Sequence, residues 1–152
     1  MDIELTTHPS AADAQALSDG IVNFNRNAVP DLEPVEAELR FCILVRDGAG
    51  TVVGGLRASC FWNTLHIELL WLSEHCRGAG VGRRILLSAE AFAHRHGCEK
   101  ALVETTSWQA RPFYERCGYR HMATLPDRPR GHASHYLCKT LGADSRAAIP
   151  GP

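Results

Sequence analysis

The stretch SEHCRGAGVGRRILLSAEAF, residues 73–92, has glycine at alternate positions: Gly78, Gly80 and Gly82. An apolar run over 65–72 comes before it, and apolar residues at helical spacing follow it. The first N–H groups of a helix have no partner inside the helix, and the helix dipole adds positive charge there. Glycine also allows the backbone to approach a bound group closely. The stretch therefore predicts a strand, a turn that binds a phosphate or pyrophosphate, and then a helix.

Several ligand classes are compatible with such a turn. A Walker loop needs Lys and then Ser or Thr, but Arg83 stands at the required offset from Gly78 and no such pair follows. A dinucleotide fingerprint has the spacing G-x-G-x-x-G, whereas the spacing here is G-x-G-x-G. The pattern R-x-x-G-x-G, which begins at Arg77, and a plain glycine-rich turn are the other two interpretations. Arg84 adds further positive charge beside the turn.

The rest of the chain alternates between strand and helix patterns, which predicts an α/β or α+β fold with a mixed sheet. Ser107 is expected to cap the last helix, with Pro112 in its first turn. Gly54 and Gly55 lie inside a strand and predict a bulge or a close backbone approach. One or two helices are predicted over 11–29 and one each over 82–96 and 107–118, and strands over 3–7, 40–46, 51–62, 65–73, 101–106, 119–125 and 132–141.

Length and composition narrow the class of protein. With 152 residues, 45% hydrophobic and 22% charged, the chain fits one soluble domain, predicted over 1–141, with a flexible tail over 142–152. The net charge of -1 gives no general attraction for nucleic acid, and neither a membrane span nor a secretory signal is expected. The six cysteines contain no CxxC pair and are expected to be reduced thiols of a cytoplasmic protein. No metal is expected, because His94, His96 and Cys98 do not converge on one ion.

Three motifs occur together in the second half of the chain. R-x-x-G-x-G at 77–82 follows a strand that ends in LLWLS (69–73), and FYERCGYR (113–120) comes downstream. Over about 40–141 the sequence thereby resembles the GNAT superfamily of N-acetyltransferases, in which R-x-x-G-x-G/A binds the pyrophosphate of acyl-CoA. The resemblance implies the GNAT fold, a mixed, mostly antiparallel sheet of six to seven strands flanked by helices. Many members carry Asn where this chain has Ser107, which can still donate to a cofactor oxygen.

The resemblance implies acetyl-CoA as co-substrate and a set of residues that bind it. The backbone of Leu70 and Leu72 would pair with the pantetheine arm. The Leu72 N–H would donate to the thioester carbonyl oxygen as negative charge develops there. The implied cofactor-binding residues are Leu70, Trp71, Leu72, Arg77, Gly78, Ala79, Gly80, Val81, Gly82, Arg83, Ser107 and Tyr114.

The implied reaction needs one group that takes a proton from the amine and another that gives a proton to the leaving thiolate. In related enzymes the base comes from the strand before the turn, which makes Glu68 the first candidate and His66 the second. By the period of two, both are expected to share a face with Leu70 and Leu72, with Glu68 desolvated beside Leu70. Tyr114 resembles the general acid of the family. As alternatives, Glu68 is a solvated surface charge, His66 bonds locally and Tyr114 is a packing residue.

The expected function is transfer of an acetyl group from acetyl-CoA to a primary amine of a small molecule, by direct attack in a ternary complex. Three alternatives stay open: a peptide or protein amine as acceptor, a sensor of the same fold that binds CoA without turnover, and an unrelated phosphate-binding regulatory domain. Segments 21–39 and 127–135 are expected to shape the acceptor cleft. His132 and His135 are expected to contact the substrate in this cleft. As an alternative, 127–135 is a solvated hairpin loop. Members of the family often form dimers, and the sequence neither supports nor excludes a homodimer.

Overall fold

The computed structural model describes residues 1–142. The flexible tail expected beyond Gly142 therefore lies outside the described residues. The chain divides into two compact units, Met1–Ala37 and the part from Glu38 onward, and each is described by itself. No helix within residues 1–142 is long and apolar enough to cross a membrane.

The N-terminal unit contains α1 (Ala11–Ala28) and the short 3-10 helix η1 (Val35–Ala37). Ser10 caps α1, because its hydroxyl accepts a hydrogen bond from the Asp13 N–H at 3.1 Å and donates one to the Asp13 carboxylate at 2.6 Å. An acidic residue in the first turn also suits the positive end of the helix dipole. The helix predicted for this segment is confirmed.

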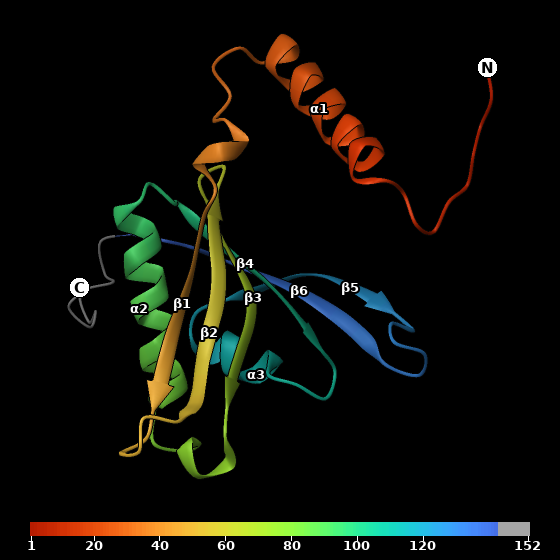
Figure 1. Cartoon of the computed structure of the whole chain (residues 1–152). Helices are drawn as coiled ribbons and strands as arrows, with labels where there is room; N and C mark the ends of the chain where they lie inside the picture. Colours follow the sequence, from red (N-terminus) through yellow and green to blue (C-terminus); the bar gives the residue numbers. More distant parts are fainter. Residues whose placement is uncertain (143–152) are drawn as a thin grey trace. The chain divides into compact units, whose positions relative to one another are not determined.

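A six-stranded sheet forms the basis of the second unit (Figure 1). The strands lie in the order β1-β2-β3-β4-β6-β5. β3 and β4 are parallel, and all other neighbours are antiparallel. The strands are β1 (Leu39–Arg46), β2 (Val52–Phe61), β3 (Thr64–Leu72), β4 (Lys100–Thr106), β5 (Arg120–Pro126) and β6 (Ala133–Thr140). The predicted mixed, mostly antiparallel sheet is confirmed.

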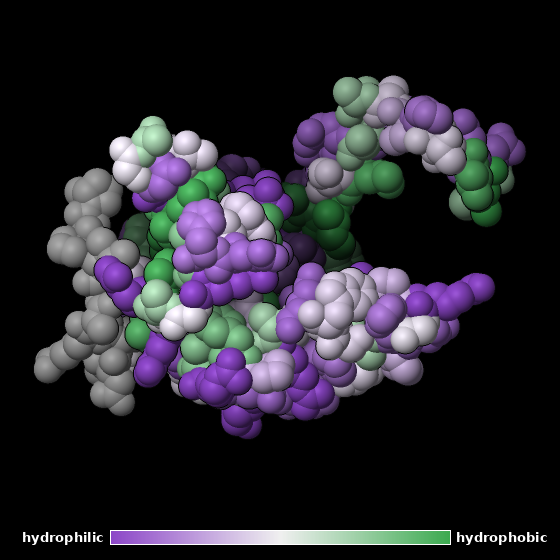
Figure 2. Space-filling view, turned by 90° about the horizontal axis from the view of Figure 1, so that it is seen from below, coloured by the Kyte–Doolittle hydropathy of each residue, from purple (hydrophilic) through white to green (hydrophobic). Residues whose placement is uncertain are grey.

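Helix α2 (Val81–Arg95) connects the two parallel strands and packs on β2 and β3 (Figure 1). A short 3-10 helix, η2 (Glu74–Cys76), comes before it. Hydrophobic side chains of α2 and of the central strands form the core, while other hydrophobic residues reach the surface, as Figure 2 shows in green. Core residues include Leu65, Ile67, Leu86, Ala89, Val103 and Leu137.

Two predictions about local structure are wrong. The strand expected over 3–7 is absent, because residues 1–10 form neither helix nor strand. Weak alternation does not make a strand where no neighbour completes its hydrogen bonds.

The second wrong prediction concerns the start of α3 (Arg111–Arg116), which Ser107 does not cap. The Ser107 hydroxyl instead accepts a hydrogen bond from the Ala133 N–H at 3.2 Å, so it ties the preceding loop to β6. The N-cap residue is Ala110, whose N–H donates to Thr105 Oγ1 at 3.2 Å. A tertiary contact therefore replaced the local cap.

Gly54 and Gly55 lie where strands approach each other too closely for a side chain. A Cβ on Gly54 would lie 2.4 Å from Cδ2 of Leu72, and a Cβ on Gly55 would lie 2.3 Å from the backbone oxygen of Ile43. The pairing of β1 with β2 also shifts register beside Gly54. The expected close approach is confirmed.

We expect Gly55→Ala to destabilise the protein by about 3 kcal/mol, the upper part of the range for overpacked cores, because backbone cannot move aside as a side chain can. The free energy of unfolding, measured by urea denaturation, checks this. Gly48→Ala is the matched control, since a Cβ there meets nothing within 4 Å. Equal free energies of unfolding for the two variants would contradict the prediction.

Candidate active site

The sheet opens between its two parallel strands. β3 and β4 pair only from Thr64 to Ile67 and from Lys100 to Val103, although β3 continues to Leu72 and β4 to Thr106. Figure 1 shows the two strands moving apart beyond the paired part. Beyond Ile67, the edge of β3 that faces β4 therefore has no strand partner there. An extended ligand can hydrogen-bond to such an edge as an added strand would.

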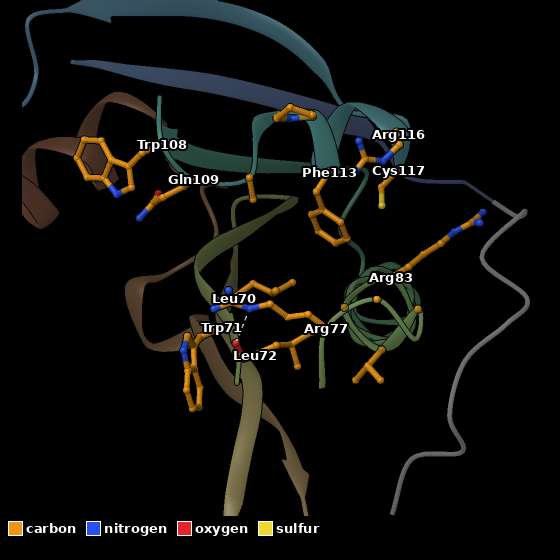
Figure 3. A pocket seen from close by; sticks show the side chains of 16 residues that line it. Leu70, Trp71, Leu72, Arg77, Arg83, Trp108, Gln109, Phe113, Arg116 and Cys117 are labelled. Carbon is orange, nitrogen blue, oxygen red and sulfur yellow. Dashed lines mark hydrogen bonds between the residues drawn. The ribbon is translucent and has the colours of Figure 1, made fainter. Parts of the chain in front are cut away.

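A cleft of about 860 Å³ lies at this opening (Figure 3). The end of β3, the glycine turn with the start of α2, and the region of α3 all contribute to its lining. In Figure 3, Phe113 points from α3 toward α2. The lining residues are Leu70, Trp71, Leu72, Arg77, Gly78, Gly80, Val81, Gly82, Arg83, Trp108, Gln109, Ala110, Pro112, Phe113, Arg116 and Cys117.

The glycine turn leaves backbone N–H groups at the start of α2. Gly78 and Gly80 have φ angles of +82° and +74°, a backbone region that favours glycine. Gly80 is the N-cap residue and has no side chain to cap the helix, and the Arg84 N–H donates to the Gly80 carbonyl at 3.1 Å. The N–H groups of residues 81–83 precede that bond and so have no partner within the helix. This arrangement fits a diphosphate.

Gly82 lets α2 come close to its neighbours. A Cβ at this position would lie 3.4 Å from Cδ1 of Leu72 and 3.5 Å from Cε2 of Phe113. The start of α2 is thus in contact with both the end of β3 and with α3. These three elements form the wall of the cleft.

Arg77 lines the cleft and also supports the strand. Its Nε donates to the backbone oxygen of Leu72 at 3.0 Å. This oxygen was expected to pair with the pantetheine arm, so the Leu72 N–H and the Leu70 backbone remain for that role.

β3 contains a bulge at Glu68. Arg57 of β2 pairs with Leu69 and the next residue, Ala58, pairs with Ile67, so Glu68 has no opposite residue. An extra residue shifts the alternation of side chains by one position.

The bulge overturns one expectation about the faces of β3. Leu70 and Leu72 pack against the hydrophobic core, whereas His66 and Glu68 are exposed. The four side chains therefore do not share a face. The period of two fails because it assumes an unbroken ladder with the neighbouring strand.

Glu68 is held by an arginine. Its Oε2 accepts from Nε of Arg57 at 2.5 Å, and the Glu68 side chain is 30% exposed. The expected desolvation beside Leu70 is therefore wrong. In the chain, Glu68 directly follows Ile67, the last residue of β3 that pairs with β4, so its backbone lies at the start of the opening.

Tyr114 is buried in α3 and is not among the residues that line the cleft. It is 4% exposed, and its ring contacts those of Phe113 and Tyr119 with centroids 5.2 and 5.5 Å away. Burial, with a smaller contribution from Cys117, raises the pKa of Tyr114 to about 12. The phenol is therefore neutral and protonated near pH 7.

The structure brings together most of the implied cofactor-binding residues, but not all of them. Ala79, Ser107 and Tyr114 are not among the residues that line the cleft. The sequence analysis missed the contribution of 108–117 beyond Tyr114, including Arg116 and Cys117. The F-Y-x-x-x-G motif located this helix, but only its packing against α2 decides which side chains face the cleft.

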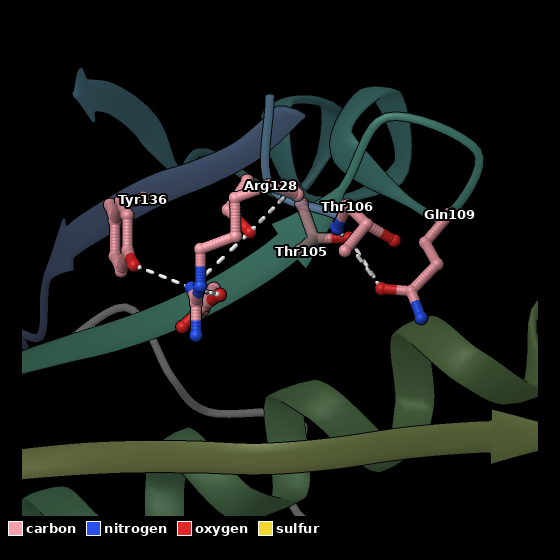
Figure 4. Close-up of polar contacts among 7 residues, drawn as sticks. Thr105, Thr106, Gln109, Arg128 and Tyr136 are labelled. Atoms are coloured by element: carbon pink, nitrogen blue, oxygen red, sulfur yellow. Dashed lines mark hydrogen bonds and ion pairs between the residues drawn. The ribbon is translucent and has the colours of Figure 1, made fainter. Parts of the chain in front are cut away.

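Polar contacts order the segments beside the cleft (Figure 4). Gln109 Oε1 accepts from the Thr106 N–H at 3.1 Å. From the β5–β6 hairpin, Arg128 contacts the carboxylate of Glu104 and donates to the Tyr136 hydroxyl at 3.0 Å. The ring of His132 contacts Trp108 edge-on, with centroids 4.6 Å apart. The hairpin is therefore attached to the sheet and to Trp108 of the cleft lining, while residues 127–132 remain exposed to solvent, as in a solvated hairpin loop.

Comparison with known proteins agrees with this geometry. A family model described as "Acetyltransferase (GNAT) family" matches residues 10–119. The chain is 41% identical over 117 residues to "Blasticidin-S acetyltransferase" of Streptomyces morookaense, which covers 76% of this chain and 84% of that protein. It is 27% identical over 139 residues to "Acetyltransferase Atu2258" of Agrobacterium fabrum, covering 91% and 98%. A crystal structure of an acetyltransferase from Bacillus cereus superposes with a TM-score of 0.79 at 26% identity, covering 91% and 98%.

The fold and the cleft thus define an acyl-CoA-dependent transferase. The chain belongs to the GNAT acetyltransferase family. It is an N-acetyltransferase, and acetyl-CoA is its acetyl donor.

Proposed function

We propose that the protein transfers the acetyl group of acetyl-CoA to a primary amine of a small molecule, by direct attack in a ternary complex. The observation that carries this proposal is the cleft at the opening between β3 and β4. It joins the N-terminus of α2 to an unpaired strand edge. The 41% identity to a protein named for acetylation of blasticidin S supports a small-molecule acceptor.

Different residues of the cleft bind different parts of acetyl-CoA. The N–H groups of 81–83, with Gly78 and Gly80, bind the diphosphate, and the side chain of Arg83 adds positive charge beside it. The backbone of Leu70 and the N–H of Leu72 bind the pantetheine arm and the thioester carbonyl oxygen. Acetyl-CoA supplies the acetyl group as a thioester.

Two side chains carry out the proton transfers, one as the base for the amine and one as the acid for the thiolate. An alkyl amine with a pKa of about 10.4 is mostly protonated at pH 7 and must lose a proton before it attacks. Glu68, at the start of the opening, takes this proton, and His66 on the same exposed face is the second candidate. Tyr114, kept neutral by burial next to the lining residues Phe113 and Cys117, gives a proton to the departing thiolate.

The β5–β6 hairpin limits the acceptor side of the cleft. His132 packs against Trp108, which lines the cleft, and Arg128 is fixed by Glu104 and Tyr136. A bounded site of this kind suits a compact acceptor better than an extended polypeptide.

The test is an amine screen with acetyl-CoA, in which mass spectrometry detects the acetylated product. We expect acetylation of small polyfunctional amines and none of lysine-containing peptides. Gly80→Val should weaken acetyl-CoA binding at least tenfold, because a β-branched residue is strained at a φ of +74°. Gly48→Val is the control, since nothing lies within 4 Å of a Cβ there.

Each other outcome identifies an alternative. Acetylation of peptides alone would assign a protein acceptor. Tight binding of acetyl-CoA with no product from any amine would favour a sensor that does not turn over.

A further inference from the structure

Three arginines line the cleft, and two of them have no partner in the part of the chain that the structure describes. Arg77 donates to Leu72, as above. Arg83 on α2 and Arg116 on α3 take part in no hydrogen bond or ion pair with another residue of 1–142. Both side chains are exposed to solvent. Two guanidinium groups that have no ion-pair partner and line a cleft are suited to bind an anion.

The two arginines lie in one region of the cleft. Gly82, the residue before Arg83, is positioned against Phe113, which is one helical turn before Arg116. Burial raises the pKa of Cys117, while the charges of Arg83 and Arg116 both oppose that shift, so both groups are near the Cys117 thiol. Figure 3 shows Arg83, Arg116 and Cys117 on the side of the cleft away from Trp71 and Trp108.

The order of these elements matches the order in which the parts of coenzyme A are joined. The end of β3 is followed by the glycine turn at the start of α2, and Gly82 places both next to α3. In coenzyme A the pantetheine arm is followed by the diphosphate and then by a ribose that carries a 3′-phosphate. With the pantetheine on β3 and the diphosphate at the turn, the next anionic group reaches the side of Arg83 and Arg116.

Building on the proposed function, we propose that Arg116, with Arg83 beside it, forms a subsite for the 3′-phosphate of coenzyme A. A guanidinium group binds a phosphate through paired N–H donors, and such charge-assisted bonds are about twice as strong as neutral ones. A phosphate monoester carries about -1.5 to -2 charge near pH 7, so it gains more from two arginines than a neutral hydroxyl does. The subsite distinguishes coenzyme A from dephospho-coenzyme A, which lacks only this phosphate.

The test compares the dissociation constants of coenzyme A and dephospho-coenzyme A by calorimetry at one salt concentration. We expect the unmodified protein to bind coenzyme A about tenfold more tightly, equivalent to about 1.4 kcal/mol. Arg116→Gln should weaken binding of coenzyme A about tenfold and leave that of dephospho-coenzyme A unchanged. Arg120→Gln, which removes the same charge from an exposed position at the start of β5, should preserve the tenfold preference.

Two results would overturn the subsite. Equal affinities of the unmodified protein for the two ligands would show that the 3′-phosphate is not recognised. Equal weakening of both ligands by Arg116→Gln would place this residue at the diphosphate instead. Failure of the unmodified protein to bind either ligand at millimolar concentration is a different result, because it removes the proposed function together with the subsite.

Discussion

Glu68→Gln should lower kcat/KM for the amine acceptor by about 100-fold, the lower end of what a general base contributes. Glutamine keeps the shape of the side chain and its contact with Arg57 but cannot take a proton from the ammonium group. Binding of acetyl-CoA should stay within about twofold, because Glu68 does not line the donor cleft. Steady-state kinetics with a responsive amine, together with calorimetry for acetyl-CoA, measures both effects.

Glu115→Gln is the matched control for this variant. Glu115 also accepts from the Nε of an arginine, Arg111, at 2.9 Å, and it is similarly exposed on the surface. Its replacement should leave kcat/KM within about twofold. If Glu68→Gln retains full activity while His66→Gln loses it, the base is His66 and the first assignment is wrong.

Tyr114→Phe should lower kcat by about 100-fold and leave the KM for acetyl-CoA nearly unchanged, since only the donation of a proton to the thiolate is lost. Burial first, and Cys117 second, raise the pKa of Tyr114 from 10.0 to about 12. The folded state therefore favours the protonated phenol. The resulting stabilisation is fully present below pH 10 and is lost as the pH rises through 12. Kinetics up to pH 10 should accordingly show no loss of activity from ionisation of Tyr114.

Tyr119→Phe provides the comparison for Tyr114→Phe. Tyr119 is equally buried and touches the ring of Tyr114, and burial also raises the pKa of its hydroxyl. It has no assigned part in the reaction, so its replacement should keep kcat within about twofold. Similar losses for both variants would mean that Tyr114 acts through packing of α3 and not as an acid.

Local sequence patterns were sufficient to predict most helices and strands, but not which neighbouring element each side chain contacts. Apolar periodicity together with cap and turn residues predicted all six strands and the three α-helices, because these signals lie close together in the sequence. They failed at residues 3–7, where a weak alternation has no neighbouring strand, and at Ser107, whose hydroxyl binds β6 instead of capping α3. Both failures depend on whether a partner distant in sequence is present, which a local pattern does not record.

The sequence by itself determined the glycine turn, the helix that follows it and the family, because these depend on residues close together in the chain. Only the tertiary structure decided which side chains meet. The opening between β3 and β4 and the bulge at Glu68 depend on register between strands. The buried Glu90 on α2, paired with Lys139 of β6 at 2.6 Å, depends on how a helix packs against the sheet. Such contacts join residues far apart in the chain, so the periodicity of hydrophobic residues within one segment does not predict them.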